Sequence, residues 1–439
     1  MKKLSSNRGW SLWIFDFNIR IRVGMLAIVA LFVSQVLCAE SLAIEPFGQT
    51  QPVPTTYFGM HIHRADTTTP WPNAGFGSWR LWDAHVNWVD LEPSRGEWNF
   101  ERLDRLVAMA KLTKVDVLLP LALTPTWASA RPLEKSSYGL GNAAEPADIE
   151  DWKTYVRTVA TRYRGRVYHY ELWNEVNIPS FYSGSKEQLI QLARETYTIL
   201  KEVDSRNVLV GPSVTGGGKH LDWLSGYFQK GGGQYLDVVA YHFYVPNDAP
   251  EAMLSLISSV QRIMQQNGLS SKPLWNTESG WGMLNYDGTP KPAWAYPKWE
   301  ELESNVAAAY VSRALILNWA AGVQRFYFYA WDNSLMGLME PTSKALKPAA
   351  MAYTNTLHWI VGKKISKCVS SSNGVWSCDL LARQKLLAKI VWTQRGTRLY
   401  KIPRGWGAKS VAHLYDISQS TVSADGLEQI GIEPILIYF

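Results

Sequence analysis

From residue 57 to residue 362 the chain repeats one pattern, in which a short apolar segment precedes a longer segment with helical spacing of apolar residues. Apolar segments of this length, rich in β-branched and aromatic residues, are typical of buried strands. Their alternation with helical segments indicates βα units and a parallel sheet. The eight expected strands are 57–63, 78–82, 115–121, 167–177, 208–213, 238–243, 273–278 and 325–331.

The length of 439 residues fits one barrel and one small domain better than three average domains, because a (β/α)8 barrel takes about 250 residues. Beyond residue 362 the helical patterns stop, and short alternating segments such as 386–392 and 435–438 are separated by turn residues. We therefore predict a (β/α)8 TIM barrel at 44–362, with an extended lead-in, and a small C-terminal β-sandwich domain at 363–439.

The first 43 residues have the features of a signal peptide or N-terminal export segment. Five basic residues precede an apolar run at 23–37, and the small-x-small sequence Ser41-Leu42-Ala43 follows it. We expect cleavage after Ala43, with a cut near Cys38 as the alternative, and hence a periplasmic or secreted protein. The run of 15 residues is short for a membrane span, but if it is not cleaved, residues 23–37 would anchor the protein to a membrane.

The two remaining cysteines, Cys368 and Cys378, would then lie in an oxidising compartment. The sequence Ser-Ser-Ser-Asn-Gly at 370–374 between them is typical of a hairpin turn, so we predict a Cys368–Cys378 disulfide. Two thiols alone cannot form a structural zinc site, and the histidines lack metal-ligand spacing, so we expect no metal. Gly59 stands alone after the first strand, where a dinucleotide would need a glycine-rich turn, so we expect no cofactor.

The net charge of +6 is unevenly distributed along the chain. Residues 1–23 carry five basic side chains and one acidic one, and residues 363–439 carry eleven basic and five acidic ones. The segment between them therefore has a net charge of −4. Because nucleic-acid binding requires basic residues around the site, we expect no nucleic-acid partner.

A carboxylate ends two of the expected strands. Glu175 follows Trp173-Asn174 in the fourth strand, and Glu278 follows Trp275-Asn276-Thr277 in the seventh. Barrel enzymes have their catalytic groups at the carboxyl ends of the strands, so these two side chains should share one site. Glycoside cleavage needs such a pair, with one carboxyl group protonated and the other ionised.

These two segments resemble the catalytic strands of retaining glycoside hydrolases of clan A, in which Asn-Glu ends strand four and Glu ends strand seven. The layout from about residue 57 to residue 362 is most similar to glycoside hydrolase family 39, with family 5 next. The resemblance implies that Glu175 is the acid/base, that Glu278 is the nucleophile, and that Asn174 hydrogen-bonds a sugar hydroxyl. Val176 and Asn177 follow Glu175 where many of these relatives have a proline.

The resemblance also implies supporting residues at other strand ends. Arg80, at the end of the second strand, would lie near Glu278 and lower the pKa of its carboxyl. His242 and Tyr244 form the His-x-Tyr pattern of strand six, so Tyr244 would donate to Glu278, and His242 would orient the acid or line the sugar site. Trp331 ends the eighth strand, where these enzymes have an aromatic floor beneath the sugar.

Other residues are weaker candidates. Glu171 points the same way as Glu175 but deeper in the barrel, so it is either structural or a rival acid. We expect the loop at 129–146 and the insert at 285–299 to decide whether the site is a cleft or a pocket. The remaining candidates for the rim of the site are His61, His63, Trp127 and Trp281.

The sequence favours a retaining glycosidase that acts on a polysaccharide or oligosaccharide, and the expected state is a monomer. The 21 Trp and 21 Tyr favour a carbohydrate partner modestly, because sugar rings stack on aromatic planes. A transglycosylase with the same residues and a non-catalytic carbohydrate-binding barrel are the alternatives. Binding alone does not need two carboxylates with Arg80, Asn174 and Tyr244 around them, which argues against the second alternative.

Overall fold

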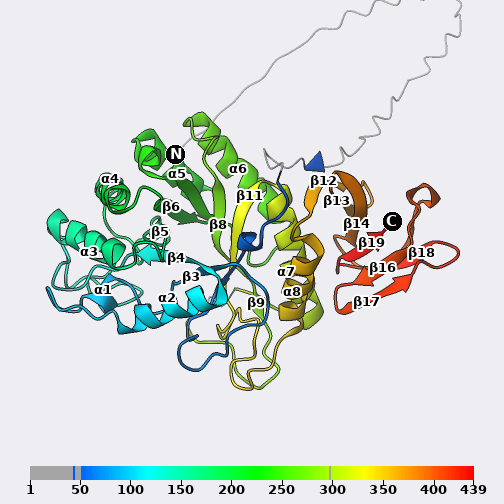
Figure 1. Ribbon diagram of the computed structural model, residues 1–439, viewed down its shortest axis with the longest axis horizontal. Helices are drawn as coiled ribbons and strands as arrows, with labels where there is room; N and C mark the ends of the chain where they lie inside the picture. Colours follow the sequence, from blue (N-terminus) through cyan, green and yellow to red (C-terminus); the bar gives the residue numbers. More distant parts are fainter. Residues whose placement is uncertain (1–42, 45–50, 296–297) are drawn as a thin grey trace, which may run out of the picture. The chain divides into compact units, whose positions relative to one another are not determined.

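Eight parallel strands close into a barrel, which confirms the predicted fold class (Figure 1). Neighbouring barrel strands follow the chain order from β2 to β8, and β11 closes the ring between β8 and β2. The strand bounds are β2 Phe58–His61, β3 Ser78–Arg80, β4 Asp116–Leu121, β5 His169–Leu172, β6 Val208–Thr215, β7 Val238–His242, β8 Leu274–Ser279 and β11 Val323–Phe328.

The structure is a computed structural model that describes residues 43–44, 51–295 and 298–439. Apart from Ala43, the predicted export segment lies outside the described residues. Within the described ranges no helix is both long enough and apolar enough to cross a membrane.

Helices surround the barrel and follow every strand except β2, which reaches β3 through a loop at 62–77. Polar caps begin two of the longer helices: Asp148 accepts from the Glu150 backbone, and Ser185 forms a capping box with Gln188. Such caps satisfy backbone N–H groups that have no partner inside the helix. The helix bounds are α1 Trp88–Leu91, α2 Glu101–Thr113, α3 Ile149–Arg162, α4 Lys186–Val203, α5 Lys219–Gln229, α6 Ala252–Gln266, α7 Ser304–Ala320 and α8 Pro348–Ile360.

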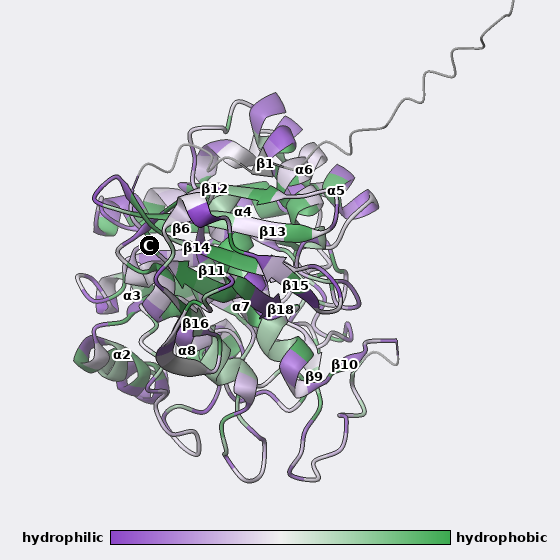
Figure 2. Ribbon diagram, turned by 90° about the vertical axis from the view of Figure 1, so that its right-hand side faces the viewer, coloured by the Kyte–Doolittle hydropathy of each residue, from purple (hydrophilic) through white to green (hydrophobic). Residues whose placement is uncertain are grey.

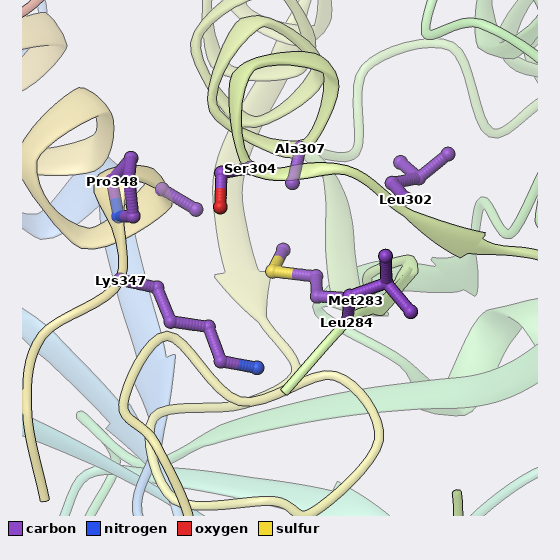
Figure 3. A pocket seen from close by; sticks show the side chains of 8 residues that line it. Met283, Leu284, Leu302, Ser304, Ala307, Lys347 and Pro348 are labelled. Carbon is purple, nitrogen blue, oxygen red and sulfur yellow. The ribbon is translucent and has the colours of Figure 1, made fainter. Parts of the chain in front are cut away.

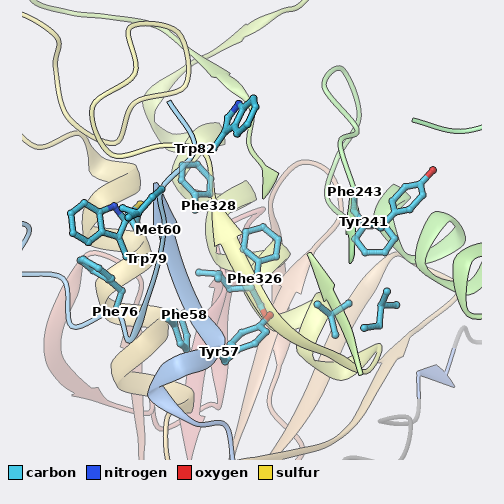
Figure 4. Packing of buried hydrophobic residues seen from close by; sticks show 14 of the residues in the cluster. Tyr57, Phe58, Met60, Phe76, Trp79, Trp82, Tyr241, Phe243, Phe326 and Phe328 are labelled. Atoms are coloured by element: carbon cyan, nitrogen blue, oxygen red, sulfur yellow. The ribbon is translucent and has the colours of Figure 1, made fainter. Parts of the chain in front are cut away.

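The barrel strands are buried on both faces, as expected for a parallel sheet covered by helices. Outside the strands lies the main hydrophobic cluster, part of which is drawn in Figure 4. Inside the barrel, near the amino ends of the strands, Arg325 lies over Trp275 at 4.4 Å and pairs with Asp116 at 2.8 Å. The apolar residues of this inner layer are Leu118, Val210, Val238, Ala240, Trp275 and Tyr327.

The C-terminal part contains two antiparallel sheets, which confirms the predicted β-sandwich class. A seven-stranded sheet has the order β1-β12-β13-β14-β19-β16-β17, and β15 pairs with β18 in the second sheet. An apolar layer that includes Val391, Ile402, Ile430 and Ile437 joins the two sheets. The bounds are β1 Ala43–Ile44, β12 Lys364–Ser370, β13 Val375–Ala382, β14 Lys385–Thr393, β15 Arg398–Lys401, β16 Ser410–His413, β17 Asp416–Thr421, β18 Leu427–Ile430 and β19 Ile435–Tyr438.

The predicted disulfide is present: Cys368 in β12 lies opposite Cys378 in β13, and their sulfur atoms are bonded. The predicted turn between them connects the two strands. Strand β1 pairs with the other edge of β12, so Ala43 of the predicted export segment and Ile44 of the lead-in complete the C-terminal sheet. The described residues also contain three short 3-10 helices and one further strand pair: η1 Thr55–Tyr57, η2 Gly232–Tyr235, η3 Arg404–Trp406, β9 Gly282–Met283 and β10 Glu301–Leu302.

Helix α7 is buried on all sides from Ala307 to Ala320, except at the half-buried Tyr310. A helix that is apolar all round must be covered all round. The barrel strand β11, helix α8 and strand β12 all pack against it. Figure 2 shows how apolar and polar residues are distributed, with apolar colouring on strands such as β11 and β14 and polar colouring on many loops.

Candidate active site

Glu175 and Glu278 lie at the same end of the barrel. Glu278 is the penultimate residue of β8, and Glu175 follows the end of β5 by three residues. One carboxylate oxygen of each and one ring nitrogen of His242 lie within 4.8 Å of one another. The backbone after β5 turns through left-handed φ angles of 60° at Trp173 and 42° at Glu175, which turn the chain out of the strand direction.

Arg80 is the central cation of the site and is completely buried. Its guanidinium donates to Glu171, to Glu278 at 2.8 Å and to Asn174 at 2.7 Å. The same Glu171 accepts a hydrogen bond from Ser213 at 2.6 Å. Glu171 is therefore a buried partner of Arg80, which fits the structural alternative given for it from the sequence.

Glu175 lies in a poorly solvated position. Burial raises the pKa of Glu175 to about 7, although a hydrogen bond from the Thr215 side chain and the charge of Arg80 oppose the rise. Its carboxylate lies 3.1 Å from Nδ1 of His242. Burial lowers the pKa of His242 to about 4, so this ring is neutral at pH 7 and its Nδ1 can accept a hydrogen bond from the protonated carboxyl of Glu175.

Glu278 has two donors that stabilise its ionised form. Arg80 lies at 2.8 Å and the Tyr244 hydroxyl donates at 2.9 Å. Burial raises the pKa of Glu278 above its usual value, and the charges of His242 and Arg80 only partly oppose the rise. Burial and the charge of Glu278 raise the pKa of Tyr244 well above its usual value, so its hydroxyl remains a donor.

The structure therefore brings together six of the predicted site residues: Glu175, Glu278, Asn174, Arg80, His242 and Tyr244. Trp331 is different, because β11 ends at Phe328 and not at residue 331 as predicted. Its side chain is 3% exposed and packs in the main hydrophobic cluster. The residue that follows the end of β11 directly is Tyr329, so Tyr329 is the better candidate for an aromatic wall, and the role given to Trp331 stays a prediction.

The four rim candidates fall into two pairs. His61 and His63 lie beside Tyr329, with ring centroids 5.0 Å and 5.2 Å from its ring. Trp127 packs on Trp88 and donates to the Glu92 carbonyl. Trp281 is fully buried, and its indole N–H donates to the carbonyls of Val245 and Asp248. The histidines therefore remain candidates, whereas both tryptophans are engaged in packing.

The sequence reasoning missed Asp83, Tyr138 and Tyr329 as site residues. Asp83 accepts hydrogen bonds from both tyrosine hydroxyls, at 2.6 Å from Tyr138 and 2.5 Å from Tyr329. The available signal was the polar residue soon after the second strand, in Arg80-Leu81-Trp82-Asp83. No local pattern could have assigned Tyr138, because the loop at 129–146 reaches Asp83 only in the folded barrel.

The insert at 285–299 also reaches the site. The ring centroids of Trp299 and Tyr244 are 5.8 Å apart. The insert is fastened where Lys347 donates to Asn285 at 2.8 Å. The pocket beside this contact is lined by Lys347 and Met283 among others and has no room for a water molecule. The side chains next to the start of the insert are therefore tightly packed (Figure 3).

Glu175, His242 and Glu278 form the one group among the described residues whose ligand atoms are close enough to hold a metal ion. However, the Arg80 guanidinium already lies 2.8 Å from Glu278. Its positive charge opposes a cation at that position. The donor set therefore suits proton transfer better than metal binding.

A barrel with a buried carboxylate pair at the ends of its fourth and seventh strands has the layout that the sequence resemblance implied. The profile of the family "Glycosyl hydrolase catalytic core" matches residues 147–332. A β-xylosidase of Geobacillus stearothermophilus is 23% identical over 207 residues, which cover 41% of this chain and 40% of that protein. The aligned part thus spans about two fifths of the length of this relative.

Solved structures extend the comparison to most of the chain. A family 39 glycoside hydrolase from Bacteroides cellulosilyticus WH2 superposes with a TM-score of 0.69 at 16% identity, over 88% of this chain and 81% of that one. A monomeric β-xylosidase from Caulobacter crescentus CB15 gives 0.59 at 16% identity, over 88% and 96%. These findings confirm the resemblance to clan A glycoside hydrolases, to family 39 in particular.

Proposed function

We propose that this protein is a retaining glycoside hydrolase that cleaves O-glycosidic bonds of an oligosaccharide or polysaccharide by double displacement. The observation that carries the proposal is that one carboxylate oxygen of Glu175 and one of Glu278 lie within 4.8 Å of each other. Retaining enzymes have their carboxyl groups about 5–5.5 Å apart, whereas inverting enzymes need about 6.5–9.5 Å for an intervening water. The short separation favours direct attack by a carboxylate.

The environments of the two carboxyl groups divide their roles. With a pKa of about 7, Glu175 is substantially protonated near neutral pH and can donate to the leaving oxygen. Glu278 is bonded to Arg80 and Tyr244, which stabilise the ionised form that attacks the anomeric carbon. The glycosyl ester on Glu278 is then attacked by a water that gives its proton to Glu175, so both groups return to their starting states.

Two variants test the roles separately on aryl glycosides, with the xylosides included because two of the relatives are named β-xylosidases. Glu278→Ala should fall close to the uncatalysed rate, and azide should restore turnover with inverted product. Glu175→Ala should impair substrates with poor leaving groups far more than activated aryl glycosides, which hardly need the proton.

The stereochemistry decides between the mechanisms. NMR of the first-formed product of the wild-type protein should show the anomer of the substrate. The opposite anomer would exclude direct attack by Glu278. A transglycosylase would reveal itself by longer products when acceptor sugars are added, and a binding protein by affinity without turnover.

We also propose that the protein is exported. The Cys368–Cys378 disulfide supports export, because such bonds persist in oxidising compartments. Strand β1 begins at Ala43, so a cut near Cys38 would keep the whole strand whereas a cut after Ala43 would remove half of it. The mass of the mature protein after cell fractionation measures the cut, and an uncleaved chain in the membrane fraction would instead favour an anchor at 23–37.

A further inference from the structure

Asp83 is a further acidic residue at the catalytic end of the barrel, besides Glu171, Glu175 and Glu278, and the mechanism above does not use it. It lies three residues beyond Arg80, the last residue of β3. Its backbone φ of 58° lies in the left-handed region, which aspartate adopts more readily than most residues other than glycine. Positions of this kind are found preferentially at active sites and ligand clamps. Both carboxylate oxygens of Asp83 already accept a tyrosine hydroxyl, from Tyr138 and Tyr329.

The Asp83–Tyr138–Tyr329 cluster shares the site with the two glutamates. Tyr329 directly follows β11, the strand between β8 and β2, and its ring lies 5.0 Å from that of His61. Burial, and after it the charge of Asp83, raises the pKa of both tyrosines well above the usual value. Both hydroxyls therefore remain donors.

The cluster is held in place by its surroundings. The ring of Tyr138 lies 5.2 Å from that of Trp82 and 5.8 Å from that of Phe181. The loop that carries Tyr138 is fixed by Arg131, which donates twice to Glu145 at 2.8 Å. A carboxylate has about four acceptor positions, of which the tyrosines use two, so Asp83 can still accept hydroxyl groups of a ligand.

The charges around the cluster favour a neutral ligand. Arg80 is the buried cation of the site, and its guanidinium already donates to three acceptors, two of them carboxylates. Burial holds the pKa of His61 well below its usual value and lowers that of His242 to about 4, so neither ring supplies a positive charge at pH 7. A sugar carboxylate here would face Asp83 and Glu278 with Arg80 already engaged, and the repulsion between like charges would weaken its binding.

We propose that Asp83, held by Tyr138 and Tyr329, determines specificity by binding hydroxyl groups of a neutral sugar next to Glu278 and by rejecting uronic acids. This inference rests on the proposed glycosidase function. It adds a recognition carboxylate to the catalytic pair and defines the substrate class by charge.

The test compares Asp83→Asn with the matched control Asp104→Asn. Asp104 also accepts a tyrosine hydroxyl, from Tyr163 at 3.0 Å, but it lies on helix α2 outside the barrel. For each protein, kcat/KM is measured on a panel of neutral 4-nitrophenyl glycosides of both anomers. Inhibition constants for glucose, xylose and glucuronic acid are then measured against the best substrate of the panel.

The wild type should bind glucuronic acid at least about tenfold more weakly than the better neutral sugar. Asp83→Asn should lower kcat/KM on the neutral substrate about 10–100-fold, and the control should not change it. The same variant should reduce the preference for the neutral sugar by about tenfold, which a general loss of structure would not do. Tyr138→Phe should shift the preference in the same direction by less.

Equal inhibition of the wild type by glucuronic acid and the neutral sugars would overturn the inference and leave the glycosidase proposal standing. An unchanged preference in folded Asp83→Asn protein would do the same. Failure of the wild type to cleave any member of the panel would count against the proposed function itself, and this inference would fall with it.

Discussion

Two completely buried arginines, Arg80 and Arg313, form carboxylate networks of different design. Arg313 in helix α7 donates to both oxygens of Glu251, which precedes α6, and Trp392 of strand β14 donates to the same carboxylate at 2.9 Å. One cation thus meets one anion, and the network ties a barrel helix to the C-terminal sheet. Arg80 instead divides its guanidinium between Glu171 and Glu278.

The difference shows which feature marks the functional network. Both arginines are completely buried, and both donate hydrogen bonds to carboxylates. Around Arg80, however, carboxylates outnumber the cation, and a third one, Glu175, has a pKa raised to about 7. Perturbed pKa values of this kind are concentrated at functional sites, whereas a balanced pair such as Arg313 and Glu251 is typical of structure.

The largest expected effect is that of Arg80→Met. The variant should lower kcat by at least about 10³-fold, because Glu278 loses the donor that stabilises its ionised form. It should also lower the free energy of unfolding, because two buried carboxylates lose their cation. Steady-state kinetics and urea unfolding measure both. Activity within tenfold of the wild type would make Arg80 equivalent to Arg313 and abolish the distinction.

Next in size, Arg313→Met should lower the free energy of unfolding by about 3–5 kcal/mol while the folded fraction keeps its kcat. Removing Glu251 as well, in Arg313→Met/Glu251→Leu, should restore much of the loss, since the uncompensated charge is gone. A double-mutant cycle from urea unfolding measures the coupling. A fall in kcat as large as that of Arg80→Met would show that the barrel–sheet contact acts on the site.

Glu175 should make stability depend on pH. Its pKa in the folded state, about 7, exceeds the ordinary 4.5, so the folded protein holds this proton more tightly than the unfolded chain does. Its contribution to stability is therefore largest below pH 4.5 and is lost as pH rises towards 7. Glu175→Gln should raise the free energy of unfolding at pH 8 by up to about 3 kcal/mol, and little at pH 4.

The same group should limit activity. In the wild type kcat/KM should fall as pH rises through about 7, because Glu175 must be protonated to donate. Parallel unfolding and kinetic titrations test both statements. An alkaline limb that persists in Glu175→Gln, or equal stability of the two proteins at pH 8, would assign the proton to another group.

The smallest effects come from removing one neutral donor from each network. Tyr244→Phe should lower kcat about tenfold or somewhat more, because a hydrogen bond to a charged group contributes about 1.5–3 kcal/mol. Trp392→Phe should cost about as much in unfolding free energy and leave kcat unchanged. Together the two variants test whether the Arg80 network serves catalysis and the Arg313 network serves stability. A stability loss without a kinetic effect in Tyr244→Phe would contradict this distinction.

The sequence by itself determined the strands, both catalytic candidates and the disulfide. These features depend on local patterns: an apolar run predicts a strand, a polar residue at its end predicts the rim, and a short polar segment between Cys368 and Cys378 predicts a hairpin. Since all parallel strands of a barrel end at the same rim, local patterns were also enough to predict that Glu175 and Glu278 share one site. The strand end predicted at Trp331 was wrong, because nothing local shows where a ladder stops pairing.

The family resemblance already placed Arg80 and Tyr244 near Glu278, but only the tertiary structure decided the partners of the other charged groups. Asp83 meets Tyr329 across 246 residues, and Trp392 meets Glu251 across 141. Such contacts form when the barrel closes and the C-terminal sheet packs on it. They persist because a buried charge without a partner costs much free energy. The resemblance marked Arg80 at a strand end, whereas nothing in the sequence marked Arg313 within its helix; the different roles of the two arginines arise from the carboxylates that folding brings to each.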